Sequence, residues 1–146
     1  MTKNPITGSN ANTGADKKYS YEDFLEIIAR LRAPDGCPWD REQTHESLKK
    51  CLLEEADEVI EAIDKKDYEN LCEELGDVLL QIVMHAQIAS EEGRFTMEDV
   101  IQGVSEKMIR RHPHVFGDIK VSSVEEGLDL WNAIKKQEKE LKKKQG

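Results

Sequence analysis

The chain has 146 residues, of which 35% are charged and only 5% aromatic, and its formal net charge is −9. This length suits one compact domain with a thin apolar core, which association with a second copy would help to complete. Eleven acids and two lysines between Glu54 and Asp77 account for the whole net charge, so the rest of the chain is neutral on balance. Acid so concentrated argues against a general nucleic-acid surface, which needs Lys and Arg, and favours a cation site or a solvated helix face.

Cysteine usage and hydropathy indicate a soluble, cytoplasmic protein. The three cysteines are odd in number and lack paired metal-type spacing, so we expect reduced thiols in the cytoplasm. No apolar leader is visible before Lys17, and the most apolar stretch, residues 78–89, is too short and too often interrupted by polar side chains to span a bilayer. We therefore expect no membrane partner.

The first predicted elements are a tail and one helix. Residues 1–19, rich in Thr, Asn, Gly and Ser, predict a disordered tail. From Ser20 onward apolar residues recur at helical spacing, and residues 33–36 (Ala-Pro-Asp-Gly) end that helix. Residues 37–40 are expected to form an ordered loop, because Trp39 needs a surface to pack on.

Four longer helices follow, and no segment shows strand-like alternation. Apolar periodicity, caps and helix stops place them at 47–64, at 67–91, between Thr96 and Pro113, and after a capping box formed by Ser123 and Glu126. The short turn at 65–67 makes the first two an antiparallel hairpin. We therefore predict an all-α domain over residues 20–138, a helical bundle with a central hairpin and a core completed by homo-oligomerisation. The Lys-rich end, 139–146, is expected to fray.

Each helix of the hairpin carries a pair of acids three residues apart, Glu55 with Glu58 and then Glu74 with Asp77. At about 100° per residue, Glu55 lies in the centre of the apolar stripe of its helix, so its carboxylate does not serve solubility. Glu58 follows one turn along the same face. Glu61 falls outside that face, and we expect it to be solvated.

The two pairs of acids are predicted to meet across the turn. In an antiparallel hairpin centred on residue 66, Glu55 faces Asp77 and Glu58 faces Glu74. Four carboxylates at such range repel one another strongly in a partly dry site, so a cation or protonation must compensate. Ligands that are all oxygen favour Mg²⁺, with Mn²⁺ as a substitute, over zinc. We therefore predict that these four residues are metal ligands.

A basic cluster ends the helix that precedes Pro113. Lys107 and Arg111 share a face of this helix and Arg110 lies beside them, so together they could clamp a triphosphate through charge-assisted contacts. The alternative is ordinary charge complementarity at a helix C-terminus. On the last helix, the apolar periodicity around Trp131 favours a core position for this side chain.

Four ordered blocks of the sequence resemble the MazG-type nucleoside triphosphate pyrophosphohydrolases, in their single-domain form. The family pattern E-E-x-x-E is matched by Glu54–Glu58, and E-x-x-D by Glu74–Asp77. Cys37–Asp40 followed by Gln43–His45, and then Lys107–Phe116, resemble the MazG branch rather than its dUTPase or dCTPase relatives. The similarity runs from about Tyr21 to Glu138. Many MazG proteins carry two such domains, so functions that need a second domain do not carry over.

The resemblance implies hydrolysis of an NTP or dNTP between the α and β phosphates, to the monophosphate and pyrophosphate, in nucleotide-pool house-cleaning. It also implies a helical bundle that forms a homodimer or a larger homo-oligomer. For Trp131, the resemblance suggests a role in nucleotide binding as an alternative to a core position. Glu54, next to the cluster, is our candidate catalytic residue, which would orient or deprotonate the attacking water or bind a second ion. The alternative for Glu54 is a solvated glutamate at the edge of the stripe.

Two other classes of function remain open. A ferritin-like di-metal carboxylate bundle would take Glu-x-x-His from two helices, whereas here the third residue after each leading Glu is Glu58 or Asp77. A non-catalytic binding module, with a cation stabilising the hairpin, would not need the basic cluster at 107–111. Pyrophosphate release measured with and without Mg²⁺ separates the three.

Overall fold

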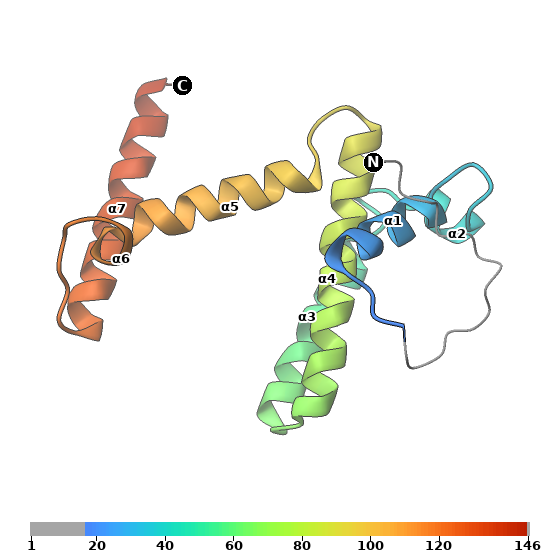
Figure 1. Cartoon of the computed structure of the whole chain (residues 1–146), viewed down its shortest axis with the longest axis horizontal. Helices are drawn as coiled ribbons and strands as arrows, with labels where there is room; N and C mark the ends of the chain where they lie inside the picture. Colours follow the sequence, from blue (N-terminus) through green and yellow to red (C-terminus); the bar gives the residue numbers. More distant parts are fainter. Residues whose placement is uncertain (1–16, 146) are drawn as a thin grey trace. The chain divides into compact units, whose positions relative to one another are not determined.

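The computed structural model describes residues 17–145, and the regular secondary structure in this part of the chain is all helix, as predicted. Its helices, drawn in Figure 1, are α1 (Tyr21–Leu31), α2 (Pro38–Glu42), α3 (Lys49–Asp64), α4 (Tyr68–Glu91), α5 (Met97–Arg111), α6 (Pro113–Phe116) and α7 (Val124–Gln145). Most of the predicted tail, residues 1–16, lies outside the described residues. The chain divides after Met97 into two compact units. The prediction of one family domain over residues 20–138 stays a prediction. None of the described helices is both long and apolar enough to cross a membrane.

Side-chain caps begin two helices of the first unit, α1 and α4. The hydroxyl of Ser20 accepts a hydrogen bond from the backbone N–H of Asp23, whose carboxylate accepts from the N–H of Ser20, so a capping box begins α1. Asp67 begins α4 by accepting from the N–H of Asn70. Between α3 and α4, Lys66 takes a left-handed φ of 55°. This tight turn sends α4 back along α3 as an antiparallel partner.

The core of the first unit lies where α1 and the start of α3 pack against the C-terminal half of α4. Its fully buried members are Ile28, Leu48, Val83, Met84 and Ile88. Phe24, Leu25, Leu31, Cys51, Leu80 and Met97 pack against them. The core therefore covers one side of α4, and it lies at the end of the hairpin away from the turn.

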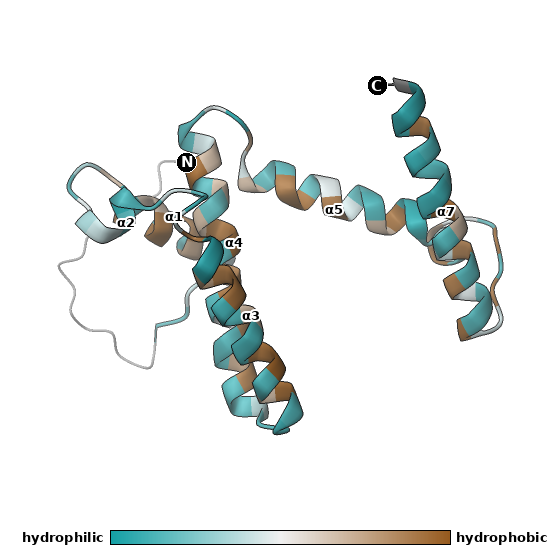
Figure 2. Ribbon diagram, turned by 180° about the vertical axis from the view of Figure 1, so that it is seen from behind, coloured by the Kyte–Doolittle hydropathy of each residue, from teal (hydrophilic) through white to brown (hydrophobic). Residues whose placement is uncertain are grey.

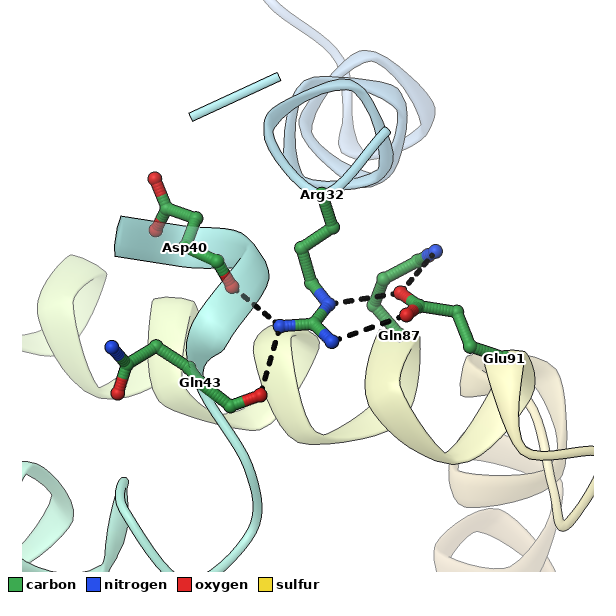
Figure 3. A network of polar contacts seen from close by, with 5 residues as sticks. All are labelled: Arg32, Asp40, Gln43, Gln87 and Glu91. Atoms are coloured by element: carbon green, nitrogen blue, oxygen red, sulfur yellow. Dashed lines mark hydrogen bonds and ion pairs between the residues drawn. The ribbon is translucent and has the colours of Figure 1, made fainter. Parts of the chain in front are cut away.

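Residues 38–40, expected to lie in a loop, belong instead to the one-turn helix α2. Pro38 begins this helix with a φ suited to its first turn. Arg32, whose side chain is 8% exposed, donates from Nη1 to the backbone carbonyls of Asp40 and Gln43, at 2.5 and 3.1 Å. Nε and Nη2 of Arg32 donate to the two carboxylate oxygens of Glu91 on α4, at 2.9 and 3.1 Å (Figure 3). One guanidinium thus fastens α2 and the segment after it to the end of α4.

The second unit begins at Glu98 and contains α5 without its first residue, Met97, followed by α6 and α7. The Nδ1 atom of His112 lies 2.6 Å from the carbonyl oxygen of Met108, at the end of α5. Ser123 accepts from the N–H of Glu126 as predicted, but the carboxylate of Glu126 accepts from the N–H and hydroxyl of Ser122 rather than closing a box on Ser123. Helix α7 continues to Gln145, past the point where we expected fraying, because the Lys- and Glu-rich end consists of good helix formers with basic residues at the C-terminus.

Replacing Arg32 with Ala is expected to lower the free energy of unfolding by about 2 kcal/mol, because two carbonyls lose a donor and Glu91 loses its counter-ion. Arg30→Ala is the matched control, since Arg30 pairs with Asp35 on the open surface, where ion pairs contribute roughly 0–1 kcal/mol. Urea unfolding of both variants measures the difference. Equal losses would mean that the network of Arg32 does not hold α2 in place.

Candidate metal centre

Four carboxylates from the two helices of the hairpin converge at one place. Glu55 and Glu58 come from α3, and Glu74 and Asp77 come from α4. One oxygen of each lies within 4.8 Å of one oxygen of every other. The spacing of three residues puts both members of a pair on one face of a helix, and the tight turn at Lys66 sets the register that brings the two faces together. The proximity predicted from the sequence is therefore present.

Burial and mutual repulsion both disfavour four negative charges in this cluster. Burial is the main cause that raises the pKa of Glu55 above its ordinary value, followed by the charges of Glu58 and Asp77. A hydrogen bond with Glu58 is the main cause that raises the pKa of Glu74, to about 7. Either protonation or a bound cation would reduce this repulsion.

The polar atoms of the cluster fit a hard divalent cation. Within residues 17–145, Oε2 of Glu55 and Oε2 of Glu74 are buried without a hydrogen-bond donor, an arrangement that is costly unless a positive charge lies beside them. All four side chains offer oxygen, the donor that Mg²⁺, Mn²⁺ and Ca²⁺ prefer. One turn beyond Asp77, the buried Oε1 of Gln81 also lacks a hydrogen-bond partner within the part of the chain that the structure describes. The cluster can therefore hold a metal ion.

Glu54 and Glu61 differ from the four clustered acids. Glu54 is exposed, lies outside the cluster, and its Oε1 is 3.8 Å from Nζ of Lys50 on the same helix. Glu61 is exposed as expected and accepts a hydrogen bond from Lys65, which lowers the pKa of Glu61. The structure thus separates the clustered acids of α3, Glu55 and Glu58, from acids of the same helix that lie outside the cluster.

The predicted substrate-binding residues all lie in the second unit, and the structure brings three of them together. Arg110 and Arg111 both donate to the carboxylate of Glu138 on α7, a residue that the sequence analysis did not single out. The guanidinium carbon of Arg111 lies 5.0 Å from the centre of the Trp131 ring. Lys107 is exposed on α5.

Trp131 contacts two adjacent residues, Arg111 at the end of α5 and His112 directly after it. Besides Arg111, it contacts the ring of His112, with ring centres 5.2 Å apart and the planes tilted by 60°. The side chain is half-buried, so it is neither a fully enclosed core residue nor a free surface aromatic. This environment is compatible with both the structural and the nucleotide-binding role considered for Trp131.

Sequence reasoning also missed a histidine pair. His45, before α3, stacks on His85 of α4 with the ring planes 2° apart, and their Nδ1 atoms are separated by 2.8 Å, so one imidazole donates to the other. Burial, followed by the proximity of His45, lowers the pKa of His85. The partner of His85 lies 40 positions away in the sequence, so local spacing could not identify it.

The fold and the cluster define a class of protein, an all-α protein with a candidate cation site made of four carboxylates on a helix hairpin. The chain belongs to the MazG nucleotide pyrophosphohydrolase domain family, whose model matches residues 43–116. That match includes the whole hairpin and extends through α6.

Known relatives support this membership. The chain is 58% identical over 123 residues to the nucleoside triphosphate pyrophosphohydrolase/pyrophosphatase MazG of Thermotoga maritima, a match over 84% of this chain and 47% of that protein. It is 47% identical over 120 residues to the nucleoside triphosphate pyrophosphohydrolase of Escherichia coli K12, over 82% of this chain and 46% of that protein. The crystal structure of a mazG-related protein from Thermotoga maritima superposes with a TM-score of 0.65 at 40% identity, covering 79% of this chain and 98% of that one.

The chain spans about half the length of these two curated relatives. It spans a quarter of a third one, the protein YabN of Bacillus subtilis, to which it is 55% identical over 121 residues.

Saturating Mg²⁺ or Mn²⁺ is expected to raise the melting temperature by roughly 5–10 °C, since a cation at a hundred times its Kd contributes about 2.7 kcal/mol. Asp77→Asn should remove most of this response, because it takes away one ligand and one negative charge. Glu61→Gln, an acid of the same hairpin outside the cluster, should keep the response. A melting temperature of wild type that does not change with either cation would contradict a metal centre here.

Proposed function

We propose that the protein hydrolyses nucleoside triphosphates, NTP or dNTP, between the α and β phosphates, with Mg²⁺ bound by Glu55, Glu58, Glu74 and Asp77. The observation that carries the proposal is the convergence of these four carboxylates, with two buried oxygens that have no donor. Membership of the MazG nucleotide pyrophosphohydrolase domain family and the names of the relatives support this reaction. We place the activity in the cytoplasm, in the house-cleaning of nucleotide pools.

The proposed reaction transfers the nucleotidyl group to water. A bound Mg²⁺ would supply Lewis-acid polarisation of the phosphate oxygens and lower the pKa of a coordinated water. The oxygen of water forms a bond to the α-phosphorus, the bond from that phosphorus to the bridging oxygen breaks, and pyrophosphate leaves. Glu54 accepts the proton of the attacking water or orients it, and its exposed carboxylate is free to do so since its contact with Lys50 is a weak surface pair.

The reaction also requires that the negatively charged triphosphate be bound, and the basic residues of α5 are suited to this. A triphosphate carries about four negative charges at neutral pH, so an acidic protein needs cationic groups to bind it. We propose that Lys107, Arg110 and Arg111 bind the phosphates and that Trp131 contributes to nucleotide binding. The proximity of Arg110 and Arg111, and of Arg111 and Trp131, supports a shared role for these residues.

We also propose that the protein forms a homodimer through apolar stripes of the hairpin. On α3, Leu53, Ile60 and Ile63 are exposed at helical spacing, and on α4 the same holds for Leu75, Leu79 and Ile82. Figure 2 shows hydrophobic residues along both helices. On a helical wheel these stripes lie away from the carboxylates, so covering them leaves the cation site accessible. Apolar surface repeated over several turns is typical of an interface.

Glu55→Gln is expected to lower the rate of pyrophosphate release at least a hundredfold, because the loss of one central ligand disrupts metal-assisted hydrolysis, in which several kcal/mol of transition-state stabilisation come from the ion. Glu61→Gln should stay within about twofold of wild type, since it lies outside the cluster. Steady-state assays on a panel of NTPs and dNTPs, with Mg²⁺ and with chelator, provide the comparison. Full activity in chelator, or release of phosphate instead of pyrophosphate, would refute the proposed reaction.

Leu75→Glu combined with Leu79→Glu is expected to convert a dimer into a monomer, because two carboxylates buried in an apolar interface raise the dimer dissociation constant by more than about a hundredfold. Val124→Glu on α7 is the control, since Val124 is exposed but belongs to neither stripe. Sedimentation velocity distinguishes the species. If the double variant stays dimeric, the interface lies elsewhere, and a monomeric wild type would refute the dimer altogether.

A further inference from the structure

Two arginines of the second unit converge on one carboxylate. Oε1 of Glu138 accepts from Nε of Arg110 at 2.5 Å, and Oε2 accepts from Nε and Nη2 of Arg111 at 3.2 and 2.9 Å. Glu138 belongs to α7, and the two arginines are adjacent at the end of α5. The carboxylate therefore bridges two guanidinium groups that would otherwise repel each other.

The three side chains differ in their exposure. Arg111 and Glu138 are 15% and 18% exposed, whereas Arg110 is 52% exposed. Arg111 is enclosed further by the ring of Trp131. The side chain of Arg110 is thus open to solvent, whereas the side chains of Arg111 and Glu138 are largely buried.

Glu138 leaves most of the N–H groups of the two arginines available. Each guanidinium has five N–H donors, and the bonds to Glu138 involve only Nε of Arg110 and Nε and Nη2 of Arg111. Both Nη groups of Arg110 and Nη1 of Arg111 take no part in these bonds. Hydrogen bonds from Arg111, and then from Arg110, lower the pKa of Glu138 to about 2, so its carboxylate is ionised throughout the physiological range.

We propose that Glu138 is a positioning residue that holds Arg110 and Arg111 side by side, so that their remaining N–H groups bind one phosphate chain together. The inference rests on the proposed function, because it assigns these arginines to the substrate's phosphates. A phosphate does not displace Glu138, since displacement would leave a half-buried carboxylate without its partners. Glu138 instead stays bound and reduces the conformational freedom that the two arginines lose when a polyanion binds.

Glu138→Gln tests this role by removing the charge while keeping the shape of the side chain. We expect KM for the nucleotide to rise about tenfold, with kcat within about twofold, because phosphate binding weakens while the reacting groups are untouched. Glu140→Gln, an exposed acid two residues further along α7, should match wild type in both constants. Glu138→Asp keeps the charge and should recover part of the loss, and it also serves as the informative variant if Glu138→Gln fails to fold.

A double-mutant cycle with Arg111→Ala shows whether Glu138 acts through the arginine. If it does, Arg111→Ala alone and Arg111→Ala with Glu138→Gln should have nearly equal KM values, since the second change removes support from a group already absent. Additive effects would overturn the inference. So would a lower KM for Glu138→Gln, which would mean that Glu138 competes with the phosphate, and so would an unchanged KM.

Binding of inorganic tripolyphosphate, measured by calorimetry, separates this inference from the proposed function. If wild type releases no pyrophosphate from any nucleotide, the proposed function fails. Weaker tripolyphosphate binding by Glu138→Gln than by wild type and Glu140→Gln would then still support the positioning role. If all three bind tripolyphosphate equally, the positioning role fails whatever the enzyme activity.

Discussion

Electrostatic repulsion among four carboxylates is the constraint on which the account of this structure depends. Burial raises the pKa of Glu55 and a hydrogen bond with Glu58 raises that of Glu74, and the neighbouring carboxylates raise both further. Within the described residues, one oxygen of Glu55 and one of Glu74 are buried without a donor. A protein gains nothing in stability from such an arrangement, because solvated acids would cost less. The hairpin of α3 and α4 holds the four carboxylates together, and a bound divalent cation would compensate their charge.

The network of Arg32 and the pair of arginines on Glu138 show a different use of charge. In both, guanidinium groups satisfy a carboxylate and connect segments that are distant in sequence, 59 residues apart for Arg32 and Glu91 and 27 for Arg111 and Glu138. The first holds α2 against the end of α4, and the second fixes the end of α5 against α7 within the second unit. Within the described residues, none of the four clustered acids forms such an ion pair, a pattern that favours a cation site over a structural role.

The hairpin and its cluster could be predicted because local rules determine them. Helical periodicity places Glu55 on the face of α3 that packs against α4. Because the turn is at Lys66, residues equally far from it in sequence lie opposite each other on the two helices. The one-turn helix α2 could not be predicted from its own sequence. Arg32, which lies outside the segment, stabilises it by donating hydrogen bonds to the carbonyls of Asp40 and Gln43. The same limit applies to Glu138 and to the pair of His45 and His85, whose partners are set by tertiary packing.

The most direct test of the cation site is anomalous scattering from crystals grown or soaked with Mn²⁺, with data collected on both sides of the manganese absorption edge. A cation site here predicts an anomalous peak enclosed by the carboxylates of Glu55, Glu58, Glu74 and Asp77, with Mn–O distances of about 2.2 Å, close to those of a six-coordinate divalent ion. The absence of a peak between these four side chains at saturating Mn²⁺, or a peak only elsewhere on the protein, would contradict it.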